Sequence, residues 1–170
     1  MLPIILDPEA VRIGLAGAGE GLDRKRAMLA EAGVIPSAVF AQGVPTLSDI
    51  SALKVLFVVG LDAAASAAVA KEARAAGVLV NVEDRPELCD FHLPAQVRRG
   101  DLLLTVSTGG KSPGLSRALR EELERLFGPE WEQRLDEIAR LRDTWQAEGA
   151  GPEAVSRRTR DHLSARGWVS

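Results

Sequence analysis

Short apolar runs and helix-like stretches alternate along the first two thirds of the chain. Four apolar runs have the length of buried strands and are bounded by turn residues. They are residues 11–16, 38–40, 54–59 and 78–82, of which 38–40 is the weakest. Helical patterns cover residues 20–32 and the alanine-rich stretch that Asp62 can cap. Strands that alternate with helices in this way predict an α/β fold with a Rossmann-like parallel sheet.

The last third of the chain has a mostly helical pattern. Residues 102–107 predict one strand, and Ser112 followed by Pro113 predicts the start of a helix. Leucines recur at helical spacing in that helix and give it one apolar face. They are Leu115, Leu119, Leu123 and Leu126. Residues 129–148 and 152–166 predict two more helices, separated by a glycine-rich break.

Composition places the chain among ordinary globular proteins. Hydrophobic residues make up 46% and charged residues 26% of the sequence. These fractions are typical of folded globular proteins and argue against a disordered chain. The net charge of -3 provides no positive field for a nucleic-acid backbone. The single cysteine, Cys89, cannot form an internal disulfide, and the longest apolar run is too short to span a membrane. We therefore expect a cytoplasmic protein that binds neither nucleic acid nor membrane.

A glycine-rich turn lies between the first predicted strand and the first predicted helix. Gly17 and Gly19 allow a tight turn and the approach of a pyrophosphate to the helix N-terminus. The dinucleotide fingerprint wants a small residue where the chain has Leu22, and an acidic residue near Gln42. Two interpretations therefore remain open: a dinucleotide site, or a glycine turn without a ligand.

A second glycine-rich turn, residues 108–112, precedes the helix that starts at Pro113. It is not a P-loop, because position 105 is threonine where that motif needs glycine. Free amides, the helix dipole and Lys111 still favour an anion at this helix start. Four arginines nearby suit a polycarboxylate ligand: Arg98, Arg99, Arg117 and Arg120. The alternative is a capped helix start with ordinary surface charge, for example an Arg117–Glu121 pair.

Asp84 follows the strand predicted at residues 78–82. Open parallel sheets bind ligands at the carboxyl ends of their strands, so Asp84 is well placed to act as a base. The alternative is a simple turn former before Arg85 and Pro86. Cys89 and His92 follow at a spacing that matches no zinc site, so we expect no metal and interpret Cys89 as a small buried apolar residue.

Several of these segments together resemble one family. The similarity is dense from residue 77 to 127, which includes Asn81-Val82-Glu83-Asp84, Cys89-Asp90-Phe91 and Gly109-Gly110-Lys111-Ser112-Pro113, and it is recognisable at 17–25. These residues resemble the siroheme-synthase N-terminal module, the precorrin-2 dehydrogenase and sirohydrochlorin ferrochelatase family. The resemblance implies a homodimer that oxidises precorrin-2 to sirohydrochlorin with NAD. Bifunctional members then insert ferrous iron.

The resemblance also implies a division of the chain and a set of site residues. It implies an NAD-binding Rossmann-like domain at 1–97, a dimerisation segment of strand plus helix at 98–128, and a small helical domain at 129–170. Asp84 is the implied catalytic residue. The implied cofactor contacts are Gly17, Gly19, Glu20, Gly21, Ala41, Gln42 and Asp62. The implied substrate contacts are Asn81, Arg98, Arg99, Gly110, Lys111 and Ser112.

The chain departs from the family pattern around the nucleotide site. The glycine turn reads Gly-Ala-Gly-Glu-Gly-Leu, the segment between the second and third strands is short, and Gly60-Leu61-Asp62 follows the third strand. Two alternatives therefore stay open beside the dehydrogenase. One is a chelatase with a degenerate nucleotide site, and the other is a non-catalytic dimer that senses a tetrapyrrole or a nucleotide.

Overall fold

The computed structural model describes residues 1–41 and 44–169. The chain divides into two compact units, Met1–Leu93 and Pro94–Ser170. This boundary falls before strand β5 (Ala95–Arg99), whereas the sequence-based division at residue 97 cuts through that strand. The strand stays with the second unit because it pairs with the strand that follows it.

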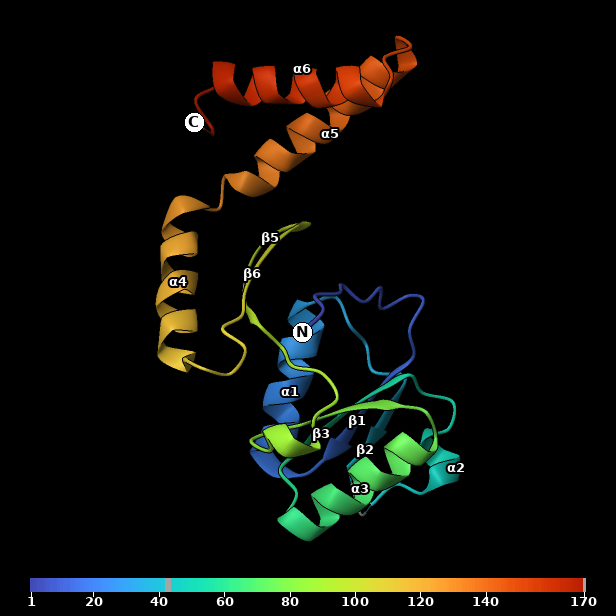
Figure 1. The fold of residues 1–170 in the computed structure, drawn as a ribbon. Coiled ribbons are helices and arrows are strands. Elements are labelled where there is room, and N and C mark those ends of the chain that lie inside the picture. Colours follow the sequence, from blue (N-terminus) through green and yellow to red (C-terminus); the bar gives the residue numbers. More distant parts are fainter. Residues whose placement is uncertain (42–43, 170) are drawn as a thin grey trace. The chain divides into compact units, whose positions relative to one another are not determined.

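The first unit contains a four-stranded parallel sheet in the order β2-β1-β3-β4 (Figure 1). Its strands are β1 (Ile13–Gly17), β2 (Ala38–Phe40), β3 (Val55–Val59) and β4 (Leu79–Val82). Each corresponds to an apolar run in the sequence, so the predicted Rossmann-like parallel sheet is confirmed. The strand order reverses between β1 and β3, and in such sheets the reversal marks the ligand-binding edge.

Helices cover both faces of this sheet. They are α1 (Gly19–Glu31), the short α2 (Leu47–Ile50) and α3 (Ala63–Ala75). Alternate β3 side chains enter two cores: Val55 and Phe57 pack with the α1 residues, while Leu56 and Val58 pack with those of α2 and α3. The continuously apolar β3 sequence is explained by this two-sided burial.

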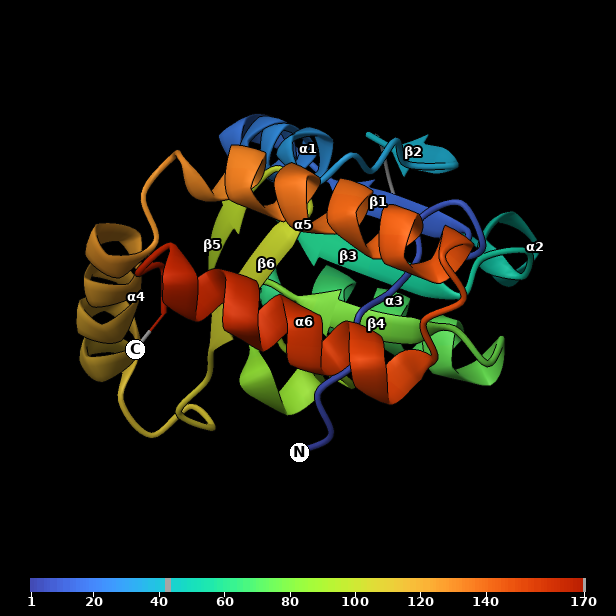
Figure 2. The ribbon, with the colours of Figure 1, turned by 90° about the horizontal axis from the view of Figure 1, so that it is seen from above.

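The second unit begins with an antiparallel hairpin of β5 and β6 (Leu102–Val106). Three helices follow: α4 (Pro113–Leu126), α5 (Trp131–Ala147) and α6 (Pro152–Ala165). The three helices and β6 match the sequence prediction. Helices α5 and α6 lie side by side (Figure 2). The guanidinium of Arg134 lies 5.0 Å from the ring centroids of both Trp131 and Trp168, which ties α5 to the end of the chain after α6.

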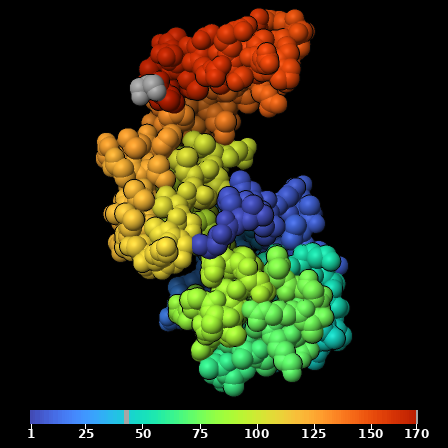
Figure 3. All heavy atoms as spheres, viewed as in Figure 1, coloured from blue at the N-terminus to red at the C-terminus, as the bar shows by residue number. Residues whose placement is uncertain are grey.

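Helix α4 leaves much of its leucine face uncovered. Leu115, Leu119 and Leu126 are 51%, 43% and 51% exposed. The helix lies on the surface in the space-filling view, in the yellow to orange colours of its residue numbers (Figure 3). The apolar face predicted from the leucine spacing is therefore present, and the described part of the chain covers it only in part. Among the described residues, none of the helices combines the length and the apolar character needed to cross a membrane.

Candidate functional site

The glycine loop, residues 17–21, connects β1 to α1 at the carboxyl edge of the first unit's sheet. Ala18 precedes the helix, and an alanine side chain cannot cap the free amides of the first turn. Gly19 has a φ of 62°, a conformation that glycine adopts without steric cost. These amides and the helix dipole form the kind of helix start that binds phosphate.

Glycines also allow this loop to lie against the end of β3. A Cβ on Gly17 would collide with the carbonyl oxygen of Val59, and a Cβ on Gly60 would collide with that of Ala18. The Ala18 amide donates to the Val59 carbonyl at 3.3 Å. Two connecting loops therefore meet backbone to backbone where the strand order reverses, and larger residues at 17 or 60 would separate them.

Gly21 lies at the centre of this meeting point and is buried. A Cβ built on it would lie 3.3 Å from Oε2 of Glu83, 3.5 Å from the amide nitrogen of Gly60 and 3.7 Å from Nη2 of Arg24. The carboxylate of Glu83, which follows β4, thus reaches the glycine loop. Sequence reasoning did not select Glu83, although its position directly after a parallel strand was the available signal.

Three further predicted cofactor residues, Asp62, Glu20 and Ala41, follow strands at the same sheet edge and differ in their contacts. Asp62 caps α3, since its Oδ1 accepts from the Ala65 amide at 2.8 Å. Glu20 is exposed and lies 3.7 Å from Nη1 of Arg24. Ala41 is exposed after β2, and Gln42 lies outside the described residues. The Asp62 carboxylate is therefore engaged in capping α3, whereas the Glu20 side chain is accessible to a ligand.

Asp84 has an unusual backbone. Its φ is 59°, which makes it the one non-glycine residue with positive φ in the described part of the chain. It occupies the third position of a turn that the Arg85 amide closes by donating to the Val82 carbonyl at 3.3 Å. Positive φ at this position favours glycine or asparagine, and a residue with a Cβ costs about 1–3 kcal/mol there. The Asp84 carboxyl is exposed, and the residues around the turn must stabilise the left-handed backbone that carries it.

A strap, residues 85–91, folds back from this turn along β4, the edge strand of the sheet. It contains one turn of 3-10 helix, η1 (Pro86–Leu88). The Asp90 amide donates to the Val80 carbonyl at 2.8 Å, and the Val80 amide donates to the Asp90 carboxylate at 2.9 Å. These bonds satisfy an edge that would otherwise present free backbone groups.

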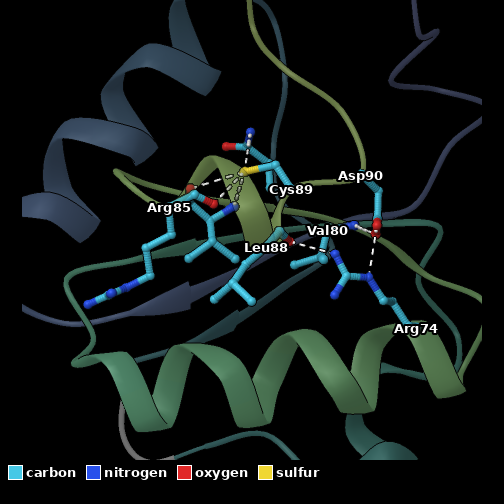
Figure 4. Close-up of polar contacts among 8 residues, drawn as sticks. Arg74, Val80, Arg85, Leu88, Cys89 and Asp90 are labelled. Carbon is cyan, nitrogen blue, oxygen red and sulfur yellow. Dashed lines mark hydrogen bonds and ion pairs between the residues drawn. The ribbon is translucent and has the colours of Figure 1, made fainter. Parts of the chain in front are cut away.

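Two side chains anchor the strap to neighbouring elements. Arg74 of α3 donates from Nε to Asp90 at 2.9 Å and from Nη2 to the Leu88 carbonyl at 2.9 Å (Figure 4). Asn81 of β4 donates from Nδ2 to the Phe91 carbonyl at 2.9 Å. The Asn81 amide, a predicted substrate contact, is therefore engaged by the strap.

Cys89 lies within the strap beside the Asp84 turn. It is half-buried rather than buried as predicted, and it packs against the core on the α3 side, which agrees with its interpretation as an apolar residue. That interpretation is incomplete, because the Val82 amide donates to its Sγ at 3.2 Å. The thiol in turn faces the carbonyls of Val82 at 3.2 Å and Arg85 at 3.3 Å, and it can donate its one proton to either.

The predicted substrate residues of the second unit gather around the start of α4 and the hairpin. Ser112 caps α4, because its hydroxyl accepts from the Leu115 amide at 3.2 Å. Gly110 has a φ of 78° in the turn before it, and Lys111 is exposed. This geometry fits a capped helix start and leaves the Lys111 ammonium available to an anion.

The two predicted hairpin arginines differ in their surroundings. Arg99 is half-buried and donates from Nε to the Phe127 carbonyl at 2.8 Å, so its side chain ties β5 to the end of α4. Arg98 is exposed. Arg117 pairs with Glu121 at 3.0 Å, as the surface-charge alternative predicts. Of the nearby cations, Arg98 and Lys111 are thus the better candidates for a ligand.

Comparison with known proteins identifies the family of the chain. A family model described as "Putative NAD(P)-binding" matches residues 37–95, and one described as "Sirohaem biosynthesis protein central" matches residues 99–126. The siroheme synthase of Methylococcus capsulatus is 34% identical over 141 residues, which cover 72% of this chain and 30% of that protein. The chain belongs to the family of the siroheme synthase N-terminal module.

Other relatives of this siroheme synthase module extend the match. The siroheme synthase of Azotobacter vinelandii is 29% identical, and the alignment covers 90% of this chain and 40% of that protein. The module therefore spans well under half the length of these curated relatives. A solved structure of SirC, precorrin-2 dehydrogenase, has the same fold, with a TM-score of 0.69 at 17% identity, covering 92% of this chain and 86% of that one.

Proposed function

We propose that this module oxidises precorrin-2 to sirohydrochlorin with NAD as the hydride acceptor. One observation carries the proposal: Asp84 stands after β4 in a left-handed backbone, and its neighbour Glu83 reaches the glycine loop at Gly21. A carboxylate and a phosphate-type loop therefore share one edge of the sheet. Open parallel sheets bind their ligands at this edge.

The glycine loop fits a dinucleotide. The first-turn amides of α1 have no side-chain cap from Ala18 and can donate to a pyrophosphate, and Gly19, where an added Cβ would meet no described atom within 4 Å, leaves space for its approach. Residues 38–46, around the end of β2, contain neither a lysine or arginine that would pair with a 2′-phosphate nor an acidic residue that would bind the ribose hydroxyls, so we propose NAD on the family resemblance. NAD, when bound, supplies the carbon that accepts the hydride.

Asp84 is the proposed base. Oxidation removes a hydride and a proton from the substrate, and the carboxylate of Asp84 takes the proton. The exposed position and the left-handed turn present this carboxylate to solvent-accessible space at the sheet edge. A positioned general base contributes a factor of about 10²–10⁴ to the rate.

Carboxylates of the substrate would bind to cations and donors of the second unit. Arg98 and Lys111 are exposed and can form charge-assisted hydrogen bonds with them. The Gly110 amide and the Ser112 hydroxyl would add donors, with Arg99 supporting the hairpin. We also propose a homodimer in which the exposed leucines of α4 are covered, and sedimentation equilibrium tests this part directly.

The experiment is a conversion assay on the purified chain with precorrin-2, with and without NAD. The proposal predicts that the absorbance spectrum of sirohydrochlorin appears only with NAD. Saturable NAD binding without conversion would contradict it and favour a sensor. Absence of NAD binding combined with iron insertion into added sirohydrochlorin would contradict it and favour a chelatase. Adding ferrous iron after conversion tests whether the same module completes siroheme.

A further inference from the structure

We propose that Cys89 is a positioning residue that holds Asp84 in its left-handed backbone conformation. The role rests on the proposed function only in so far as Asp84 is the base. The conformational part of the inference concerns the turn itself and can be tested without substrate.

The contacts of the thiol flank Asp84 on both sides. Its sulfur accepts from the amide of Val82, the first residue of the turn, at 3.2 Å, and faces the carbonyl of Arg85, the last residue of the turn, at 3.3 Å. Among the described residues, the only backbone hydrogen bond that closes the turn is the one that the Arg85 amide donates to the Val82 carbonyl at 3.3 Å. The thiol therefore links the two ends of a four-residue turn whose third residue is in an unfavourable conformation.

The strap fixes the position of the thiol through bonds to elements outside the turn, in addition to the bond that the Leu88 amide donates to the Arg85 carbonyl at 3.0 Å. On one side, the Cys89 amide donates to the Pro86 carbonyl at 3.1 Å and closes η1. On the other side, Asp90 is bonded to Val80 and to Arg74, each at 2.9 Å. The cysteine thus lies between two anchors, of which Figure 4 shows the one at Asp90, and its sulfur contacts the turn from this fixed position.

A serine or an alanine at position 89 separates positioning from packing. Serine keeps a donor and acceptor at this place, whereas alanine removes both. Leu88→Ala is the matched control, because Leu88 packs against the same core while its side chain makes no hydrogen bond to the turn. We expect Cys89→Ala to alter the turn, Cys89→Ser to retain it largely, and Leu88→Ala to leave it unchanged.

The first readout is conformational and uses no substrate. In ¹⁵N,¹³C-labelled wild-type protein, the intraresidue amide–Hα NOE of Asp84 should be strong, as positive φ requires. In Cys89→Ala the NOE should weaken, and in Leu88→Ala it should stay. An unchanged NOE in Cys89→Ala would overturn the inference. So would an equal loss in the Leu88→Ala control, because general loosening of the strap would then explain both.

The second readout is a stability cycle with Asp84→Gly. Glycine adopts positive φ without strain, so in the Asp84→Gly background the loss of the thiol contacts releases no strain and costs their full free energy. In the aspartate background, loss of the same contacts lets the turn relax, and the strain that is released partly offsets the lost bonds. Cys89→Ala should therefore destabilise the Asp84→Gly chain more than the wild-type chain. Equal losses in the two backgrounds would overturn the inference.

The third readout tests whether the thiol contacts of Cys89 affect catalysis. In the conversion assay, Cys89→Ala should lower kcat by about tenfold to about 100-fold with KM for NAD unchanged, and Cys89→Ser should recover most of the rate. A parallel rise of KM for NAD, or no loss of kcat, would contradict a positioning role. A wild-type chain that converts no precorrin-2 would refute the proposed function, while the NOE and the stability cycle would still decide whether Cys89 holds the turn.

Discussion

The carboxylate of Glu83 and the backbone of Gly21 approach each other closely: a methyl group on Gly21 would lie 3.3 Å from Oε2 of Glu83. The end of β4 and the start of α1 therefore lie in contact, although the two residues are far apart in the sequence. This contact connects the turn that carries Asp84 to the loop proposed to bind NAD.

Gly21→Ala is expected to weaken NAD binding while the chain remains folded. The new methyl group would lie 3.3 Å from Oε2 of Glu83, tighter than ordinary contact, and would displace this carboxylate beside the proposed pyrophosphate site, while it would make ordinary contact with the Gly60 amide at 3.5 Å. Calorimetric titration with NAD measures the effect. Gly114→Ala is the control, because Gly114 also lies in the first turn of a helix, α4, and a methyl group added to it would have no described atom within 4 Å. Equal NAD affinities in the two variants would count against the loop as the binding site.

Glu83→Gln is expected to tighten NAD binding about fivefold at low salt. A carboxylate beside Gly21 repels a pyrophosphate, and one charge at a partly solvated distance is worth about 1 kcal/mol. Titrations at two ionic strengths check this, since the gain should shrink as salt screens the charge. Glu31→Gln, at the far end of α1, should have no such effect. A loss of affinity in Glu83→Gln would mean that the carboxylate binds the nucleotide rather than repelling it.

Asp90→Ala is expected to destabilise the chain by about 1–3 kcal/mol. The variant leaves the Val80 amide without its acceptor and removes the partner of Arg74. Urea unfolding measures the change, with the exposed Asp101→Ala as control. The Arg74 ion pair contributes little of this total, because the Arg74 side chain is 42% exposed. A value for Asp90→Ala no larger than that of the control would show that the strap is dispensable for stability.

A capping box gives α2 a predictable pH dependence. Hydrogen bonds from the hydroxyl and the amide of Thr46 lower the pKa of Asp49 below the ordinary carboxyl value. Because the folded pKa is lowered, the stabilisation is present above the ordinary carboxyl pKa and is lost as the pH falls through the lowered one. NMR titration of the Asp49 side-chain carbon checks the direction, and Thr46→Ala should bring the pKa back toward its ordinary value. An Asp49 pKa that Thr46→Ala does not raise would contradict the capping box.

The sequence predicts the parallel sheet well but misses two short elements outside it. Strands β1 and β3 are apolar throughout because both of their faces are buried, so short apolar runs bounded by turn residues locate them. Strand β5 escaped prediction because its alternation of apolar Ala95 and Val97 with polar Gln96 and Arg98 covers only four residues, and it is stabilised by pairing with β6. Helix α2 has four residues, too few for a periodic signal.

The candidate site is predictable to a similar degree. The position of Asp84 after a strand is visible in the sequence, and so is the glycine turn. The contact of Glu83 with Gly21 arises because β4 pairs with β3 at the same sheet edge as the glycine loop, and the position of Glu83 directly after a strand was a signal for it. The bonds of Cys89 arise only when the strap folds back on β4, and because no local pattern encodes such a reversal, the role of Cys89 could be found only from the fold.

The central claim is that Asp84 is the base of a dehydrogenase, and Asp84→Asn tests it most directly. Asparagine also tolerates positive φ, so this variant keeps the turn and removes only the proton acceptor. The account predicts that conversion of precorrin-2 with NAD slows by about 10²–10⁴-fold, while NAD affinity and unfolding stability stay those of the wild type. A variant that converts precorrin-2 at the wild-type rate would contradict the account.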